Sequence, residues 1–281
     1  MRRAKRRDPL SVALRVLVWA AAAVTMGVLV LLVGYIFIMG IPNLSPELFA
    51  WEYTSDNCSM MPALMGTLAM TGLSLLIAAP LGIFSAIYLV EYAPKSSRLV
   101  KVVRMTSETL SGIPSIVYGL FGYLFFLVQL RMTYSLLAGA CTLAIMILPL
   151  IMRTTEEALL AVDPMYREGS FGLGAGRLRT VFRIVLPSAA PGILSGVILA
   201  TGRIVGETAA LIYTAGTAAN HPETLMTSVR TLSVHMYVLS GEGLHIDQAY
   251  ATAAVLLVVV VAVNALSSFI AKRLAKGGNG R

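Results

Sequence analysis

Six long blocks of apolar residues constrain the fold of this 281-residue chain more than any other feature. A hydrocarbon core of about 30 Å needs roughly 20 helical residues at about 1.5 Å each. The blocks are near or above that length, and only the fifth contains charged residues; they cover residues 16–39, 64–90, 112–130, 135–152, 191–213 and 249–270. Only 13% of the residues are charged, which excludes a soluble globular or disordered chain. We therefore predict an all-α, polytopic membrane protein with six transmembrane helices.

The distribution of basic residues predicts the orientation of these spans. With the N-terminus in the cytoplasm, the 22 Lys and Arg residues all fall in cytoplasmic segments except Arg131 and Arg230, in outer loops, and Arg203, in a span. Basic residues concentrate in cytoplasmic loops, so we predict a cell (inner or plasma) membrane protein with both termini cytoplasmic. Cys58 then lies in an outer loop, where we expect an accessible thiol.

No motif for catalysis or nucleotide binding is visible in the sequence. The patterns G-x-x-x-x-G-K-[ST] and H-E-x-x-H are absent. The three histidines share one predicted outer loop, but their spacing matches no compact set of metal ligands. The net charge of +8 is explained by cytoplasmic loops rather than by nucleic acid. We predict no catalytic residue, no metal and no cofactor.

The predicted cytoplasmic connection at 153–190 is longer than a simple link between two helices requires. It turns at Asp163-Pro164 and then reads Glu168-Gly-Ser-Phe-Gly-Leu-Gly174, nine further residues, and Ile184-Val-Leu186-Pro187. This spacing resembles the EAA motif of ABC-importer permeases, E-A-A-x3-G-x9-I-x-L-P. The positions that match are Glu168, Gly174, Ile184, Leu186 and Pro187; Gly169 and Ser170 replace the two alanines.

The resemblance implies that this loop is a coupling helix, a helix-turn-helix that docks on a separate ATPase subunit. Glycine at position 174 permits a positive φ or a close backbone approach at the turn. We expect Pro187 to end the second segment just before the chain re-enters the membrane. The alternative is a solvated surface helix that carries positive-inside arginines.

The resemblance extends over residues 62–274. Within this range the sequence is similar to the phosphate-importer permeases of the PstA type. The segments that carry it are Pro62-Ala-Leu-Met-Gly-Thr-Leu, Glu91-Tyr-Ala-Pro94-Lys95, Leu110-Ser-Gly-Ile-Pro114-Ser115-Ile-Val-Tyr118-Gly-Leu-Phe-Gly122 and Arg203-Ile-Val-Gly206-Glu207-Thr208-Ala. We divide the chain accordingly into a basic N-terminus (1–15), a first helix with its outer loop (16–61), the permease domain (62–274) and a tail (275–281).

This family implies a type I ABC-importer transmembrane domain that forms half of a pathway for inorganic phosphate and works by alternating access. It also implies three kinds of protein partner within or outside the lipid bilayer: a second permease like PstC, a dimer of ATP-binding subunits like PstB, and an extracytoplasmic phosphate-binding protein like PstS. ATP hydrolysis would belong to the ATP-binding subunits. The alternatives are a permease for molybdate or sulfate and a non-transporting membrane sensor that works with the ATPase.

Arg203 and Glu207 are charged residues inside a predicted span, where a charge costs about 2.5–3.5 kcal/mol on insertion scales. In one continuous helix their spacing places them on one face, together with Gly192 and Gly196, which allow a neighbouring helix to approach closely. Either the pair only neutralises itself, or Arg203 contacts a passing oxyanion through its planar guanidinium. Both readings remain open at this point.

The third span is a second candidate for the substrate pathway. Pro114 inside a helix would free a backbone carbonyl, and Ser115 and Tyr118 could line the pathway beside it. The resemblance adds Thr208, next to Glu207, as a further residue of the pathway. The alternative is a kinked helix that packs closely through its glycines.

Overall fold

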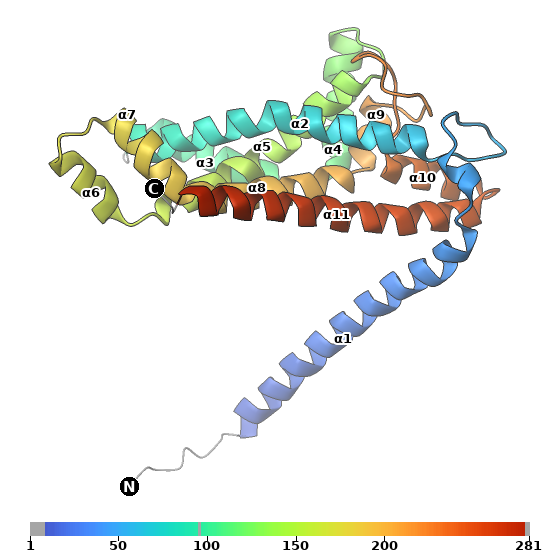
Figure 1. Ribbon diagram of the computed structural model, residues 1–281, viewed down its shortest axis with the longest axis horizontal. Helices are drawn as coiled ribbons and strands as arrows, with labels where there is room; N and C mark the ends of the chain where they lie inside the picture. The colour runs from blue at the N-terminus through green and yellow to red at the C-terminus, as the bar shows by residue number, and fades with distance from the viewer. Residues whose placement is uncertain (1–8, 95–96, 279–281) are drawn as a thin grey trace.

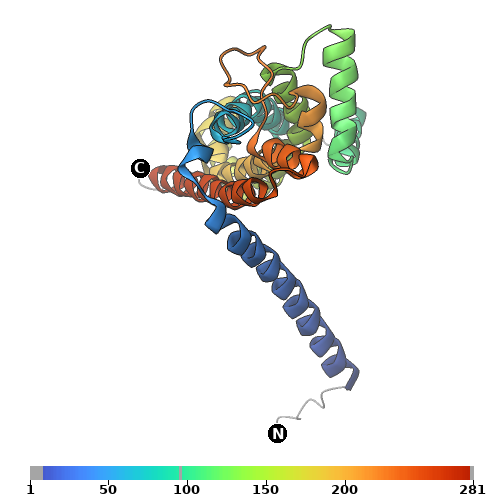
Figure 2. The ribbon, with the colours of Figure 1, turned by 90° about the vertical axis from the view of Figure 1, so that its right-hand side faces the viewer.

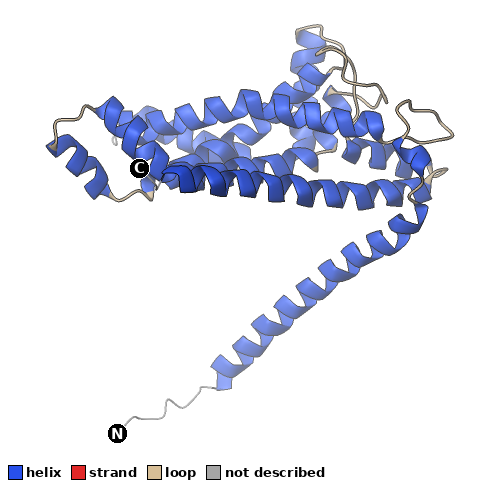
Figure 3. Ribbon diagram, viewed as in Figure 1, coloured by secondary structure: helices blue, strands red, loops and turns tan. Residues whose placement is uncertain are grey.

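The computed structural model of the protein describes residues 9–94 and 97–278, and within these ranges every regular element is helical (Figure 3). The prediction of an all-α fold is confirmed. The outermost parts of the predicted basic N-terminus (1–15) and tail (275–281) lie outside the described residues, as does Lys95.

Four long helices lie side by side and form the body of the molecule (Figure 1). They are α2 (Met61–Ile87), α5 (Leu136–Leu160), α8 (Leu186–Val205) and α11 (Ile246–Gly278). Three of them contain an internal proline, Pro80, Pro149 or Pro191. Prolines are tolerated in membrane helices because neighbouring groups satisfy the freed carbonyls.

Shorter helices close the two ends of this bundle (Figure 1). One end holds α6 (Pro164–Gly172) and α7 (Arg177–Thr180), and the other holds α10 (Leu232–Glu242). We call these the α6–α7 end and the α10 end.

Helix α1 (Pro9–Gly40) leaves the bundle at the α10 end and projects away from it (Figures 1 and 2). None of the residues in its most apolar stretch is buried within the chain. It touches the bundle only near its last turns, where the rings of Tyr35 and Tyr250 meet edge to face at 5.8 Å and Gly40 lies against Tyr250 and Ala254.

Five helical stretches among the described residues are long and apolar enough to cross a membrane without a break. A sixth exists only if α3 (Arg98–Ser111) is joined to α4 (Ser115–Gly122) and the π-helical turns at Tyr123–Gln129, two segments that meet at an angle of 105°. The helix within the predicted third span, 112–130, begins at Ser115, three residues later than predicted. Pro114 is not inside the helix: it directly precedes the first residue of α4, with φ −59° and ψ 142°. Proline disfavours a helical conformation in the residue before it, so α3 does not continue through Ile113 into α4.

The loop between α1 and α2 lies over the α10 end and buries several of its side chains there, although others, such as Trp51, are exposed. Leu48, Cys58 and Met60 are buried there against Leu232 of α10. The expectation of an accessible Cys58 thiol is wrong, since the side chain is fully buried and burial raises the pKa of the thiol.

Close contacts through glycine hold α5 and α8 together. A Cβ atom at Gly192 would lie 2.6 Å from Cβ of Ala158, and one at Gly196 would collide with the side chain of Thr154. The predicted close approach at these two glycines is confirmed, and the neighbour is α5. Small residues matter in membranes because helices there associate by packing and not by the hydrophobic effect.

We expect Gly196→Leu to destabilise the protein, because its side chain must displace Thr154 or push α8 away from α5. Overpacking of this kind costs about 1–3 kcal/mol. Gly72→Leu is the control, since a Cβ at Gly72 in α2 meets nothing within 4 Å. The measurement is the thermal unfolding midpoint of each variant in the same detergent; equal midpoints for the two variants would contradict the prediction.

Candidate functional site

The α6–α7 loop is built from local signals that the sequence displays. The carboxylate of Asp163 accepts a hydrogen bond from the backbone N–H of Met165 at 2.9 Å, and Pro164 occupies the first position of α6. Both are typical of a helix start. After α6 ends at Gly172, the chain reverses at Gly174, whose φ is +80°. A positive φ is the conformation for which glycine is suited, so the expected turn is confirmed.

A buried hydrogen bond between two hydroxyl groups closes this helix-turn-helix. The Ser170 and Thr180 oxygens lie 2.8 Å apart, and both side chains are buried. Ser170 stands where the family motif has alanine, so the departure from the motif has a structural use. Thr180 is missed by the motif, because nothing in a single sequence shows which hydroxyl will face Ser170. A Cβ at Gly169, the other departure, meets nothing within 4 Å.

The second half of the motif runs straight into the membrane helix. Residues Arg177–Val205 form one helical stretch, with π-helical turns at Val181–Val185 and Pro187 near the start of α8. The expectation that Pro187 ends the segment is wrong. The helical stretch instead continues through Pro187, which directly follows the π-helical turns and supplies no N–H to the hydrogen-bond ladder there. Ile184 and Leu186 are half-buried on this stretch, and Ser188 donates to the Ile184 carbonyl at 2.7 Å.

The outward surface of the loop combines large apolar side chains with cations. Leu173 at the turn is 91% exposed, and Met165 and Leu178 are also exposed. Glu168 and Arg179 are exposed on the same two helices. An exposed apolar patch rimmed by charges is typical of a surface that binds another protein.

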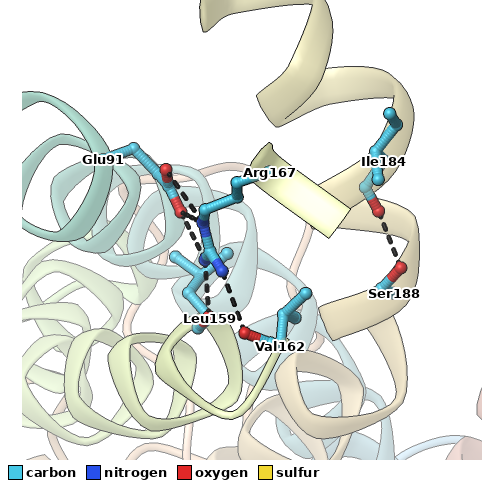
Figure 4. A network of polar contacts seen from close by, with 6 residues as sticks. All are labelled: Glu91, Leu159, Val162, Arg167, Ile184 and Ser188. Carbon is cyan, nitrogen blue, oxygen red and sulfur yellow. Dashed lines mark hydrogen bonds and ion pairs between the residues drawn. The ribbon is translucent and has the colours of Figure 1, made fainter. Parts of the chain in front are cut away.

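Arg167 fastens α6 to the bundle (Figure 4). Its guanidinium donates to the carboxylate of Glu91, with Nη2 to Oε1 at 2.7 Å, and to the carbonyls of Leu159 and Val162 at 2.8 and 2.9 Å. Glu91 lies in the π-helical turns that follow α2 (Tyr88–Tyr92), and the two carbonyls lie at the end of α5. The sequence identifies Arg167 only as one of the positive-inside residues.

The Arg203–Glu207 segment differs from the prediction of one helix face. Helix α8 ends at Val205, and α9 (Ala209–Thr214) starts after a break. Glu207 is buried, and its Oε1 accepts the backbone N–H of Ala210, while its carbonyl accepts from Ser233. The three ion pairs among the described residues do not include Arg203 with Glu207. The predicted pairing of Arg203 with Glu207 is therefore wrong, because the two residues share one face only in an unbroken helix.

The predicted pathway residues nevertheless lie around one contact, that of α4 with α9. Gly119 of α4 lies against the backbone of Ala210. Ser115 is one turn earlier on α4 and is half-buried. The Tyr118 hydroxyl donates to the Leu110 carbonyl at 2.7 Å and so braces the bend between α3 and α4.

Arg203 reaches this group of residues from the end of α8. Its charge interacts electrostatically with the Tyr118 phenol. Thr208 occupies the break and directly precedes α9. Arg203 is thus a partly exposed cation at the junction of α4, α8 and α9, and no carboxylate of residues 9–94 or 97–278 pairs with it.

The histidines of the predicted outer loop serve packing at the α10 end. His221 stacks on Trp51 with ring centroids 4.3 Å apart. His235 is fully buried near Arg230, which lies over the Tyr53 ring at 4.3 Å. Burial, and then the charge of Arg230, lowers the pKa of His235 to about 3.

His235 should make the stability of the protein depend on pH. Its pKa is lower in the folded state than in the unfolded chain, so unfolded protein binds more protons below about pH 6.5. The free energy of unfolding should therefore be independent of His235 above that pH and should fall as the pH is lowered toward 3. The fall due to this group is at most about 1.4 kcal/mol per pH unit. We expect His235→Gln to flatten the fall in unfolding midpoint between pH 6.5 and 4.5, with His245→Gln as control. Equal slopes in all three proteins would contradict this.

Comparison with known proteins places this geometry in a family. Residues 78–277 match the model of the "Binding-protein-dependent transport system inner membrane component" family. The chain is 31% identical over 278 residues to "Probable ABC transporter permease protein YqgI" of Bacillus subtilis, covering 91% of this chain and 92% of that protein. It is 35% identical over 217 residues to "Phosphate transport system permease protein PstA 1" of Mycobacterium tuberculosis, covering 75% and 71%.

A solved structure has the same fold. It is that of "a bacterial ABC transporter involved in the import of the acidic polysaccharide alginate", with a TM-score of 0.61, 17% identity, and coverage of 91% of this chain and 96% of that one. The matched region of the family model includes the α6–α7 loop, Arg167 with Glu91, and the Arg203 junction. The chain belongs to the family of binding-protein-dependent transport system inner membrane components.

Proposed function

We propose that this chain is the permease subunit of an ATP-driven importer and forms half of a transmembrane pathway for inorganic phosphate. The observation that carries the proposal is the α6–α7 loop of a family member: a turn at Gly174 with φ +80° that exposes apolar and cationic side chains at one end of a membrane bundle. Relatives named as phosphate permeases support phosphate as the substrate.

The proposed assembly has one role for each end of the bundle. The α6–α7 end faces the cytoplasm, with both termini on that side, and docks on an ATP-binding subunit dimer. The coupling residues of this loop are Glu168, Gly169, Ser170, Gly174, Ile184, Leu186 and Pro187, of which Ser170 acts from inside the loop through its bond to Thr180. The α10 end receives phosphate from a soluble binding protein. A second, homologous permease completes the pathway, and ATP binding and hydrolysis in the partner subunits drive alternating access.

Arg203 is the proposed contact for phosphate within the pathway. It has a planar guanidinium suited to oxyanions, and the Glu207 carboxylate is engaged with the start of α9. Ser115, Tyr118 and Thr208 lie around the same junction as further lining residues. A cation without a paired carboxylate is free to attract an anion, which the ion-pair reading would not allow.

We expect Gly174→Val to disturb docking of the ATPase subunit. A Cβ there meets no neighbour, so the strain comes from the positive φ alone, about 1–2 kcal/mol for a non-glycine residue and more for a β-branched one. Gly172→Val is the matched control, since it lies two residues earlier, is equally open and has an ordinary φ. Co-purification of the ATPase subunit and phosphate uptake per permease are measured; normal values for Gly174→Val would refute the assignment of the loop.

We expect Arg203→Gln to reduce phosphate uptake about tenfold or more at normal membrane levels, the effect of losing one or two charged hydrogen bonds. Arg203→Lys should be intermediate, because a point charge replaces a bidentate donor. Glu207→Gln should be mild, since its amide oxygen can still accept from Ala210. The control is Arg131→Asn in a loop. Full phosphate uptake by Arg203→Gln would exclude the contact. Uptake of molybdate or sulfate instead of phosphate by the unaltered protein would reassign the substrate.

A further inference from the structure

Helix α6 has few attachments to the bundle. It packs against α7 and the π-helical turns at Val181–Val185, which belong to the same loop. Met165 and Tyr166 on its first turn are exposed. The hydrogen bonds of Arg167 are therefore its principal connection to α2 and α5.

The Arg167 connection is also the best buried ion pair among the described residues. The side chains of Arg167 and Glu91 are 19% and 9% exposed, against 60% and 65% for Arg153 and Glu157. Nε of Arg167 donates to both oxygens of Glu91 as well, at 3.1 Å to Oε1 and 3.4 Å to Oε2, so two guanidinium nitrogens hold the carboxylate, a contact that we call the fork. Such paired bonds fix direction as well as distance.

The same guanidinium caps α5. The last carbonyls of a helix have no partner within it, and they carry the negative end of the helix dipole. Arg167 donates to the carbonyl of Leu159 in the last turn of α5 and to that of Val162, two residues after the helix ends (Figure 4). One side chain of α6 thus joins the ends of both α2 and α5. From α7, Arg177 lies over the ring of Tyr92, next to Glu91, at 5.8 Å and adds a weaker contact to the same end of α2.

Helix α5 continues the connection to the pathway residues. Its Ile151 lies against Gly82 of α2, its Thr154 against Gly196 of α8, and its Thr142 against Gly122 of α4. At these contacts there is no space for even one extra carbon atom, so α5 cannot shift without moving its neighbours. Helix α4 carries Tyr118, beside Arg203.

We propose that Arg167 and Glu91 are positioning residues that make α6 move as one body with the ends of α2 and α5, so that a displacement of α6 by the ATPase reaches the pathway. The proposal rests on the coupling role of the α6–α7 loop in the proposed function. Without the fork, the ATPase still docks on the exposed surface of the loop, but the loop moves without the bundle.

The test uses the complete transporter, with both permeases and the ATPase subunits, in liposomes with the phosphate-binding protein. Phosphate uptake and ATP hydrolysis are measured in the same preparation, and their ratio is the readout. The variants are Arg167→Gln, Arg167→Lys, Glu91→Gln and the double Arg167→Gln/Glu91→Gln. The matched controls are Arg153→Gln and Glu157→Gln, which remove an exposed ion pair at the same end of the bundle.

We expect the ATPase to co-purify with every variant. Phosphate moved per ATP hydrolysed should fall roughly three- to thirtyfold in Arg167→Gln and Glu91→Gln. Arg167→Lys should fall less, because one ammonium can pair with Glu91 but cannot also reach both carbonyls. The double variant should be no worse than Arg167→Gln, since both changes break one fork. The controls should keep the ratio of the unaltered protein.

A proportional loss of uptake and hydrolysis, with the ratio unchanged, would mean that the fork only supports the fold, and it would overturn the proposal. An unaltered ratio with full activity would do the same. If Arg167→Gln does not accumulate in the membrane, the ratio in Glu91→Gln, which keeps the side-chain shape, decides. Normal ATPase docking and uptake in Gly174→Val would refute the coupling role itself, whereas loss there with an intact ratio in Arg167→Gln would refute only the fork.

Discussion

Hydrocarbon offers no hydrogen bonds to a peptide group, and the rest of this structure depends on that constraint. The spanning segments must satisfy their own backbone, so every regular element of the described chain is helical. Lipid is as apolar as leucine, which leaves close packing as the force that holds the helices together. Gly82, Gly122 and Gly196 all face α5, where each brings another helix into direct contact with it. The bundle is therefore organised around α5, whose end the guanidinium of Arg167 caps.

Several buried polar groups of this bundle hold two segments of the chain together. Glu207 holds the start of α9, Tyr118 braces the bend after α3, and Ser170 closes the α6–α7 turn. Arg203 instead has no carboxylate partner among the described residues and lies at the meeting point of three helices. In a low-dielectric environment an uncompensated positive charge favours a nearby anion. The geometry thus distinguishes groups that hold two segments together from a cation that lacks an ion-pair partner.

The sequence predicts well what depends on local chemistry or on hydropathy. The apolar blocks predict the long helices, Asp163-Pro164 predicts the start of α6, and Gly174 predicts the turn with positive φ. The sequence predicts poorly where the result depends on whether a helix continues without a break. A four-residue spacing pairs Arg203 with Glu207 only in an unbroken helix, and the break between them has no signal stronger than one glycine. The forks and hydroxyl contacts between distant segments, such as Arg167 with Glu91, are set by tertiary packing that no local pattern records.

Helix α1 has a consequence for how such a chain comes to be assembled. It shares almost no surface with the bundle beyond its last turns, so the bundle can be completed without it. Its other sides have no protein neighbour among the described residues, so in a bilayer lipid covers them. Over its 32 residues, about 48 Å of helix, α1 is therefore held in place more by the bilayer than by the other helices of this chain.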